Sequence, residues 1–305
     1  MTQLNKAYVA ALLYALIIGF SFMFVKIALA SASPIDTLAH RFTLAFLAAA
    51  IPLITKQVRL DITSKDFIAI LPLAILYPAL FFTFQAFGLV YTSSSEAGII
   101  QAAVPIFTLV LATYFLKEQS TQWQKLSTLL SVAGVIYIFA MKGIMLDLTN
   151  MKGIILILLS TLSAACYNVL ARKIARKYSL TVITYIMATL GMITFNGIAL
   201  IEHATAHTLA YYFAPFANKS FLIATLYLGV ISSFGTAFLS NYVLSRMEAS
   251  KMSVFSNLAT LITIFAGVVF LQEKLESFHI IGAAIIILGV IGTNYLGKNQ
   301  KKTID

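Results

Sequence analysis

The chain has 305 residues, of which 60% are hydrophobic and 10% charged, and its formal net charge is +10. Soluble domains contain about 45–50% apolar and about 25% charged residues, so this composition excludes an ordinary soluble enzyme or binding domain. Apolar runs long enough to cross a hydrocarbon core of about 30 Å recur along the whole chain and predict a polytopic membrane protein. The single cysteine, Cys166, excludes an internal disulfide framework.

Ten apolar stretches separated by short connectors are predicted to be membrane-spanning helices. In chain order they cover 7–30, 34–55, 66–90, 93–116, 121–141, 152–172, 179–202, 219–245, 249–271 and 277–296. The first imitates a secretory signal peptide, but its apolar run is too long and Lys26 interrupts its end, so we expect a retained helix. The connector 203–219 is aromatic and mildly polar, which is typical either of a lid or of a segment in the membrane interface.

Lysine and arginine are unevenly divided between the two sides of this all-α membrane protein. With the N-terminus on the cytoplasmic side, fifteen basic residues fall on that side. The opposite side has four, Lys142, Lys152, Lys219 and Lys274. Loops rich in lysine and arginine stay in the cytoplasm, so we expect a plasma-membrane protein with both termini cytoplasmic. This distribution explains the positive net charge without a nucleic-acid partner.

An internal repeat with an offset of 155 residues relates the two halves of the chain. Residues 95–136 and 250–291 share eight identities in 42 positions, including a Phe-Leu-x-Glu motif that ends in Glu118 and in Glu273. Each half, 1–146 and 147–305, then holds five helices, and the second half ends in a short basic tail. Because five is odd, we expect two inverted five-helix repeats, an arrangement typical of secondary transporters. An old duplication in a protein without transport activity is the alternative.

The chain resembles the EamA-type branch of the drug/metabolite transporter superfamily. The resemblance rests on "FL-x-E" and "GV" near the end of each half, "HRF" at His40–Phe42 and "VPIFT" at Val104–Thr108. It covers essentially the whole chain and implies a small-metabolite transporter whose cavity is lined by the first, third, fourth, sixth, eighth and ninth helices. The second half departs from the pattern, because Thr260 stands in the place of Pro105 and no arginine corresponds to Arg41.

Polar residues inside the predicted helices are candidates for the substrate cavity. Gln101, Pro105 and Thr108 share one helix face, and the repeat offset places Ser256 and Thr260 on a matching face. We expect the two faces to lie opposite each other, either packed closely or reaching a water-filled cavity. The cavity candidates are Tyr77, Gln85, Gln101, Tyr167, Asn168, Ser233, Thr236, Ser256, Asn257 and Thr260.

Ionisable residues inside or at the edge of the predicted helices are candidates for gating because charge is costly in a bilayer. They are Lys26, His40, Arg41 and Glu96. An ion pair between Arg41 and Glu96 would neutralise both charges. Alternatively, Arg41 or Lys26 attracts a substrate carboxylate at the outer mouth.

Four further residues are predicted to be architectural. Pro78 follows Tyr77 in the third helix and is expected to bend it, as is Pro105 in the fourth. Glu118 and Glu273 lie at helix ends, where charge is tolerated. We expect them to cap connectors or contact neighbouring helices and not to bind solute.

The pattern as a whole favours a transporter and not an enzyme. The chain has no phosphate-binding loop of the Walker type, and we expect no cofactor and no metal site. The expected activity is efflux of an amino acid or a similar neutral, zwitterionic or amphipathic solute by alternating access. Transport would proceed by facilitated diffusion or by exchange down a substrate gradient, with proton coupling through Glu96 or His40 as the alternative.

A small-solute channel and a membrane-embedded enzyme or scaffold are the rival classes. The expected partners are the solute and the lipid bilayer; the sequence leaves the oligomeric state open.

Overall fold

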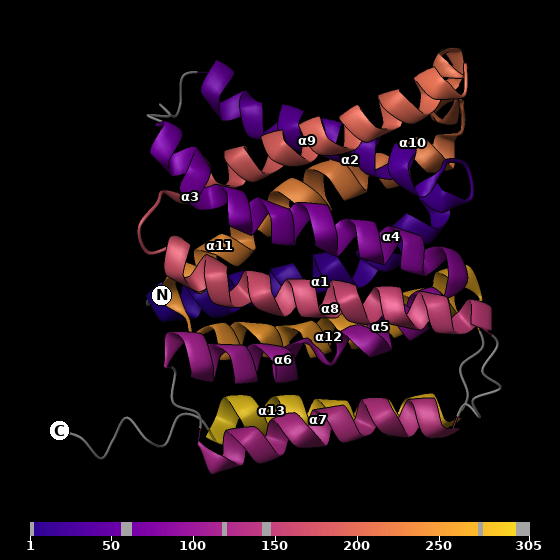
Figure 1. The fold of residues 1–305 in the computed structure, drawn as a ribbon. Helices are drawn as coiled ribbons and strands as arrows, with labels where there is room; N and C mark the ends of the chain where they lie inside the picture. Colours follow the sequence, from indigo (N-terminus) through magenta and orange to yellow (C-terminus); the bar gives the residue numbers. More distant parts are fainter. Residues whose placement is uncertain (1–2, 56–62, 118–120, 142–147, 274–276, 297–305) are drawn as a thin grey trace.

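The computed structural model describes residues 3–55, 63–117, 121–141, 148–273 and 277–296, apart from some side chains within the helices. All regular structure in these residues is helical, and the helices lie side by side in one bundle (Figure 1). In chain order the elements are α1 (Gln3–Leu29), α2 (Pro34–Ile54), α3 (Ser64–Ala74), η1 (Ile75–Leu80), α4 (Phe81–Tyr91), α5 (Ser94–Gln101), α6 (Val104–Leu111), η2 (Ala112–Leu116), α7 (Gln122–Met141), α8 (Leu148–Ile174), α9 (Leu180–Thr205), η3 (Leu209–Tyr211), η4 (Ala214–Ala217), α10 (Lys219–Leu226), η5 (Tyr227–Gly235), α11 (Thr236–Arg246), α12 (Ala249–Leu271) and α13 (Ser277–Leu296).

Helical stretches in the described residues are long and apolar enough to cross a membrane. Six meet this description: Gln3–Leu29, Ser64–Tyr91, Ser94–Leu116, Met151–Ile174, Leu180–Thr205 and Lys219–Arg246. A helix satisfies its own backbone hydrogen bonds, which hydrocarbon cannot do. The expectation of a multi-pass membrane protein built from helices is therefore confirmed.

Polar residues at the connectors fix where helices begin. Thr63 accepts the N–H of Asp66, whose carboxylate in turn accepts the N–H of Thr63, and this capping box starts α3. Ser93 and Glu96 form the same reciprocal box at the start of α5. Each box satisfies backbone donors that the first helical turn leaves free.

Helices from the two halves of the sequence interleave, and the first helix of each half packs against the third and fourth spans of the other half. In the first half, α1 packs against α11 and α12; in the second half, α8 packs against α4, α5 and α6. Further contacts join α5 to α12, α2 to α9 and η5, and α7 to α13, and the last pair forms a layer at one edge of the bundle (Figure 1). Ser127 and Ser131 of α7 approach Gly292 and Gly289 of α13 so closely that a side chain on either glycine would collide with them.

The third residues of the two Phe-Leu-x-Glu motifs have the same backbone conformation. Lys117, which follows η2, and Gln272, which follows α12, both adopt the left-handed conformation, with φ angles of 54° and 57°. Glu273 reaches Ser94 at the start of α5, so α5–α6 and α12 run antiparallel and their motifs lie at opposite ends of the bundle (Figure 1). Glu118 lies outside the described residues. We name the end at which α1 begins the N-terminal end and the other the far end.

Candidate functional site

The third predicted span is interrupted near its middle. Tyr77 has extended angles, φ −149° and ψ 107°, inside the π-helical segment η1, and Pro78 follows it. Proline donates no backbone hydrogen bond and disfavours helical geometry in the residue before it, which explains the kink. The span at the corresponding place in the second half contains the π-helical segment η5, before α11. Such irregular segments inside membrane helices are tolerated where protein or a cavity surrounds them.

The fourth span, predicted over 93–116, is one helical stretch from Ser94 to Leu116 that a turn at Ala102 and Ala103 interrupts. α5 ends at Gln101, and α6 begins at Val104 with Pro105 in its first turn. Pro105 has no N–H to donate to the Gln101 carbonyl, and the Ala103 N–H bonds to Ile100, three residues back, so the regular hydrogen-bond pattern is interrupted here. In α12, where Thr260 takes the place of proline, the helix is continuous from Ala249 to Leu271. The departure from the repeat at Thr260 thus has a structural consequence.

A small cavity lies where the interrupted third and fourth spans meet α1, α8 and α12. Its volume is about 30 Å³, room for very few waters and far too little for a metabolite. The described residues that line it include no charged side chain. The lining residues are Tyr14, Ile18, Phe22, Tyr77, Phe81, Gly98, Gln101, Val104, Ala164, Tyr167, Asn168, Ala259, Thr260 and Thr263.

Stacked tyrosines form one wall of this cavity. The rings of Tyr77 and Tyr167 lie 4.7 Å apart with 30° between their planes. The Tyr167 hydroxyl lies 2.9 Å from Ser240 Oγ and donates to Asn241 Oδ1 over 3.1 Å. Tyr167 therefore joins α8 to α11 beside the cavity, in a region of apolar helices where its hydroxyl would otherwise be unsatisfied.

Gln101 forms a second polar contact at the break between α5 and α6. Its Nε2 donates to Ser160 Oγ on α8 over 3.2 Å, and Ser160 donates onward to the Phe81 carbonyl over 3.0 Å. Ser160 and Phe81 are themselves buried. The contact connects the broken fourth span to the kinked third span through α8.

Satisfied hydrogen bonds close the cavity toward the far end. Thr260 Oγ1 donates to the Gly98 carbonyl over 2.8 Å, and Thr263 Oγ1 donates to the Gly19 carbonyl over 2.9 Å. These bonds tie α12 to α5 and to α1. Farther toward that end, Glu273 accepts the N–H groups of the first residues of α5. The face of α12 that contains Thr260 therefore lies against Gly98, about two turns before Pro105, and the expected pairing of polar faces did not include Gly98.

Buried polar atoms toward the N-terminal end are left unsatisfied. Thr108 Oγ1, Asn241 Nδ2 and Asn257 Oδ1 have no hydrogen-bond partner in the part of the chain that the structure describes. Each belongs to a helix that flanks the cavity, and Thr108 and Asn257 lie beyond Gln101 and Thr260 in that direction. Polar groups of this kind normally bind water or a ligand.

Arg41 is buried without an acidic partner among the described residues, so the predicted ion pair with Glu96 is wrong. Its side chain is 1% exposed, and it donates to Ser233 Oγ over 2.6 Å and to Ser232 Oγ over 3.1 Å. Its guanidinium also lies 4.0 Å from the ring centre of Phe82. Two hydroxyl groups of η5 thus take the place of the carboxylate, because Glu96 is turned toward Ser93 at the start of α5.

Lys26 and His40 both bond to backbone carbonyls near the far end. Lys26 Nζ donates to the Leu89 carbonyl over 2.7 Å, where α1 approaches the end of α4. His40 Nε2 lies 2.9 Å from the Tyr212 carbonyl, and the rings of Tyr212 and Phe216 lie within 5 Å of the imidazole ring, at 4.5 and 4.7 Å. The two side chains therefore hold connecting elements and do not line the cavity.

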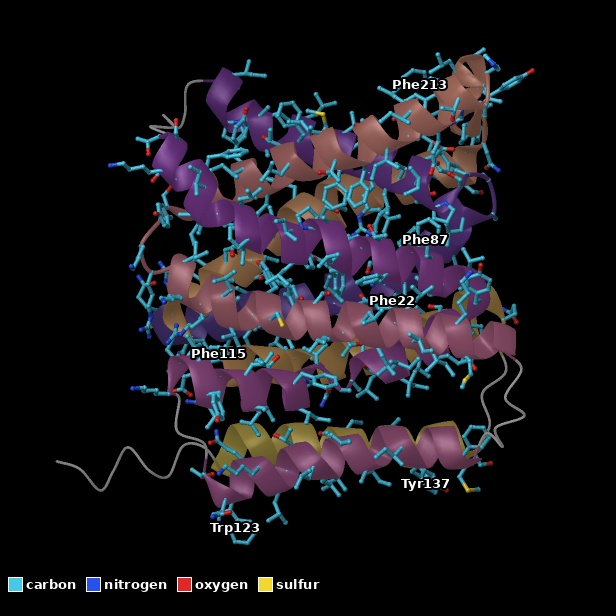
Figure 2. All side chains as sticks on the ribbon, in the orientation of Figure 1. Phe22, Phe87, Phe115, Trp123, Tyr137 and Phe213 are labelled. Carbon is cyan, nitrogen blue, oxygen red and sulfur yellow. The ribbon has the colours of Figure 1, made fainter. Side chains whose placement is uncertain are left out.

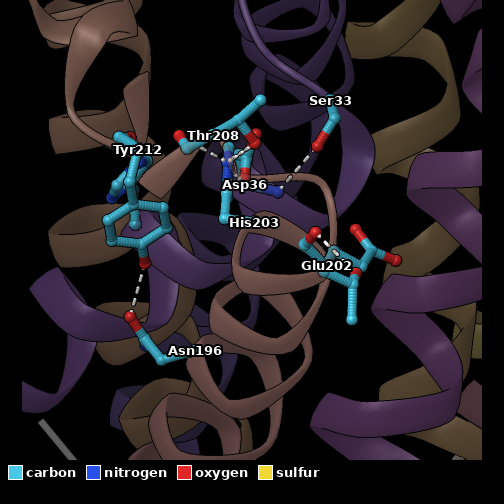
Figure 3. Close-up of polar contacts among 9 residues, drawn as sticks. Ser33, Asp36, Asn196, Glu202, His203, Thr208 and Tyr212 are labelled. Atoms are coloured by element: carbon cyan, nitrogen blue, oxygen red, sulfur yellow. Dashed lines mark hydrogen bonds and ion pairs between the residues drawn. The ribbon is translucent and has the colours of Figure 1, made fainter. Parts of the chain in front are cut away.

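The connector after α9 folds over the ends of α2 and α9. His203, in the last turn of α9, lies between Asp36 and Thr208 (Figure 3), at 3.0 Å from Asp36 Oδ1 and 2.7 Å from Thr208 Oγ1. Tyr212 donates to Asn196 Oδ1 over 2.6 Å, also in Figure 3. Phe213 is 68% exposed at the far end, while Phe115 marks the N-terminal end (Figure 2).

The remaining predicted residues lie apart from the cavity. Gln85 and Thr236 are buried but do not line it, and Ser233 lines a separate apolar cavity of about 10 Å³ together with Pro78. The side chain of Ser256 lies outside the described part of the structure.

Sequence reasoning placed the first helix in the cavity wall through the family resemblance, but it did not single out the lining residues Tyr14, Ile18 and Phe22. Because α1 has no polar face, its sequence does not indicate which side faces the cavity, and the hydroxyl of Tyr14 in an apolar run was the one available signal for that residue. Gly98 was not predicted to line the cavity either, because a glycine has no side chain to suggest it; its importance appears only where Thr263 packs closely against it.

The chain is similar to transporter sequences along its whole length. It matches the EamA-like transporter family twice, over residues 5–140 and 151–295. It is 57% identical over 301 residues to YcxC, an uncharacterized transporter of Bacillus subtilis, and the match covers 99% of this chain and 96% of the relative. An uncharacterized transporter of Archaeoglobus fulgidus is 28% identical over 279 residues, covering 89% of this chain and 92% of the relative. One solved crystal structure, 16% identical, shares the fold with a TM-score of 0.71 over 96% of this chain and 98% of that one.

Proposed function

The chain belongs to the EamA-like transporter family, and from this premise we propose that it exports a small metabolite across the plasma membrane by alternating access. Ten membrane-spanning segments would form two inverted five-helix repeats, 1–146 and 147–305, with both termini in the cytoplasm. The observation that carries the proposal is the small polar cavity at the meeting point of the interrupted spans. Discontinuous helices around a midplane site are typical of secondary transporters.

The small volume of the cavity supports alternating access over a continuous channel. A volume of about 30 Å³ holds no solute, so the bundle must open before one binds. Toward the far end, Thr260 and Thr263 bond α12 to α5 and α1, although Ser94 Oγ at that end is unsatisfied among the described residues. Toward the N-terminal end, Thr108, Asn241 and Asn257 leave buried polar atoms unsatisfied. We assign the N-terminal end to the cytoplasm and expect solute to enter along these polar groups.

The lining favours a zwitterionic or neutral solute such as an amino acid. Tyrosine hydroxyls and the amides of Gln101 and Asn168 offer hydrogen bonds, and no charged side chain in the lining would bind an ion strongly. Arg41 is a buried cation on α2 that contacts Phe82, next to the kink at Tyr77, and it has no carboxylate partner in the described residues. The positive charge of Arg41 would attract the carboxylate of a zwitterionic solute, although Arg41 itself does not line the cavity.

The test is counterflow in proteoliposomes with the full chain. Vesicles loaded with unlabelled amino acids should accumulate a labelled one, and uptake should saturate. Gln101→Leu should abolish counterflow. Gln85→Leu is the matched control, because Gln85 is an equally buried glutamine that does not line the cavity. Equal losses in both variants, or non-saturating flux without counterflow, would contradict the proposed site and mechanism. Metabolite profiling of cells that lack or overproduce the protein would select the solutes and the direction.

A further inference from the structure

A basic pocket lies at the N-terminal end of the bundle, away from the cavity. Its volume is about 430 Å³, and its lining contains five basic residues and one carboxylate. The basic residues are Lys117, Arg172, Lys173, Arg176 and Lys177. The carboxylate, Glu248, already pairs with Lys251 at 2.7 Å. The pocket is therefore strongly positive, and the solute cavity does not account for it.

An apolar groove of about 250 Å³ continues directly from this pocket between α6–η2 and α8. Leu116 and Lys173 line both. Along α8 the groove is formed by Cys166, Val169 and Leu170, and the next turn brings Lys173, so one helix face changes from apolar to basic. On the other side, Phe115 is 72% exposed and lines the groove.

We propose that the basic pocket and the apolar groove together bind one anionic phospholipid. The phosphate would be held by Lys173, Arg176 and Lys177, and an acyl chain would lie along Val169, Leu170 and Phe115. Basic pockets between membrane helices at the headgroup level are suited to anionic lipids. The combination selects a lipid over a soluble anion, because a soluble phosphate would leave the adjoining groove empty.

Arg172 anchors the helix end that forms this site to the neighbouring helix α11. Its side chain is 8% exposed, and Nη1 donates to the Leu244 carbonyl of α11 over 2.6 Å. The exposed basic residues of the next turn therefore stand on a helix end that is anchored to its neighbour. The pocket is lined from both halves of the chain, since Lys117 follows η2, whereas the other basic residues lie in the last turn of α8 or directly after it. A bound lipid would link the two halves at this end.

Native mass spectrometry of the full chain in detergent tests the proposal, with phosphatidylglycerol added against phosphatidylcholine. The wild type should retain phosphatidylglycerol and not phosphatidylcholine. The double variant Lys173→Gln/Lys177→Gln should weaken that binding roughly tenfold or more. Lys65→Gln/Lys125→Gln removes the same charge from exposed lysines outside the pocket and should change little. Equal weakening in both double variants would overturn the site.

Two further arms distinguish a lipid from a soluble anion. Cys166→Phe fills the groove and should weaken phosphatidylglycerol binding, whereas Cys166→Ser, close to the native size, should not. Glycerol phosphate, the headgroup without acyl chains, should not displace the lipid. Displacement by glycerol phosphate at lipid-like concentration would overturn the lipid assignment in favour of a simple anion site. This arm needs no variant, so a folding defect in Cys166→Phe leaves the test decisive.

Discussion

The Glu273 carboxylate accepts the backbone N–H of Ser94 over 2.9 Å, so the residues after α12 cap the start of α5. A second oxygen of the same carboxylate accepts the N–H of Ser95 over 3.0 Å and its hydroxyl. Negative charge at a helix start is favourable because the free N–H groups and the helix dipole point toward it. This contact closes the far end of the bundle beyond Thr260 and Thr263.

Glu273→Gln should therefore open the far end. Hydrogen bonds to a charged group contribute about 1.5–3 kcal/mol each, and glutamine keeps the shape but loses the charge. We expect a cysteine placed at Thr263 in a Cys166→Ser background to react faster with a membrane-impermeant thiol reagent added outside. Glu202→Gln removes an exposed carboxylate from the end of α9 and is the control. Unchanged labelling in Glu273→Gln would show that this cap is not part of a gate.

Tyr167→Phe tests the polar wall of the cavity. The variant keeps the stacking on Tyr77 but removes the contacts to Ser240 and Asn241. Buried hydrogen bonds between membrane helices average about 0.6 kcal/mol, so the protein should still fold. We expect a raised KM for counterflow. Tyr114→Phe alters a tyrosine that is 83% exposed and should behave as the wild type. A wild-type KM in Tyr167→Phe would exclude the hydroxyl from solute binding.

Arg41→Gln separates attraction of a substrate carboxylate from a structural role. Glutamine can still hydrogen-bond to Ser233, and removal of a buried cation without a carboxylate partner among the described residues should not unfold the bundle. We expect normal expression and a larger loss of transport for carboxylate-bearing solutes than for neutral ones. Arg246→Gln, which removes a cation stacked 3.9 Å from the ring centre of Tyr242, is the control. Loss of the folded protein in Arg41→Gln alone would assign Arg41 a structural role.

Gly19→Ala should disrupt the contact between α1 and α12. A methyl group at Gly19 would lie 2.5 Å from Ile262 Cβ and 2.9 Å from the Ala259 carbonyl oxygen, both on a continuous helix. Overpacking typically costs about 1–3 kcal/mol. Gly197→Ala is the matched control, because nothing lies within 4 Å of its added methyl group and alanine favours the helix. Thermal unfolding in detergent should show a lower midpoint for Gly19→Ala only; equal midpoints would refute the close contact.

The connector over the far end should loosen at high pH through Tyr212. Burial, assisted by the charge of Asp36, raises the pKa of Tyr212 from 10.0 to about 12. The folded connector therefore disfavours the tyrosinate, and its stability, complete at lower pH, falls as the pH rises from 10 toward 12. We expect subtilisin to cleave the connector faster in the upper part of this range.

Tyr212→Phe serves as the test of that assignment. It lacks the ionising hydroxyl and the bond to Asn196, so cleavage should be faster at neutral pH but less dependent on alkaline pH. Tyr211→Phe, at a site that is 68% exposed, should follow the wild type at every pH. An unchanged pH profile in Tyr212→Phe would assign the effect to another group.

Periodicity and composition predicted the helical class, the membrane setting and most helix limits. These depend on local chemistry: apolar runs of sufficient length must form helices in a bilayer, and residues such as Ser93 and Glu96 cap whatever helix follows them. The repeat was likewise visible in the sequence, and Lys117 and Gln272 carry it into matching left-handed helix ends.

Tertiary structure alone decided which polar residues meet. Arg41 finds hydroxyl groups of η5 instead of Glu96, although both acceptors lie far from it in the chain. Gln101 lines the cavity and Gln85 does not, and both are buried glutamines in apolar helices. Composition tells that a polar group must avoid lipid; the packing of other helices around it determines which partner it receives.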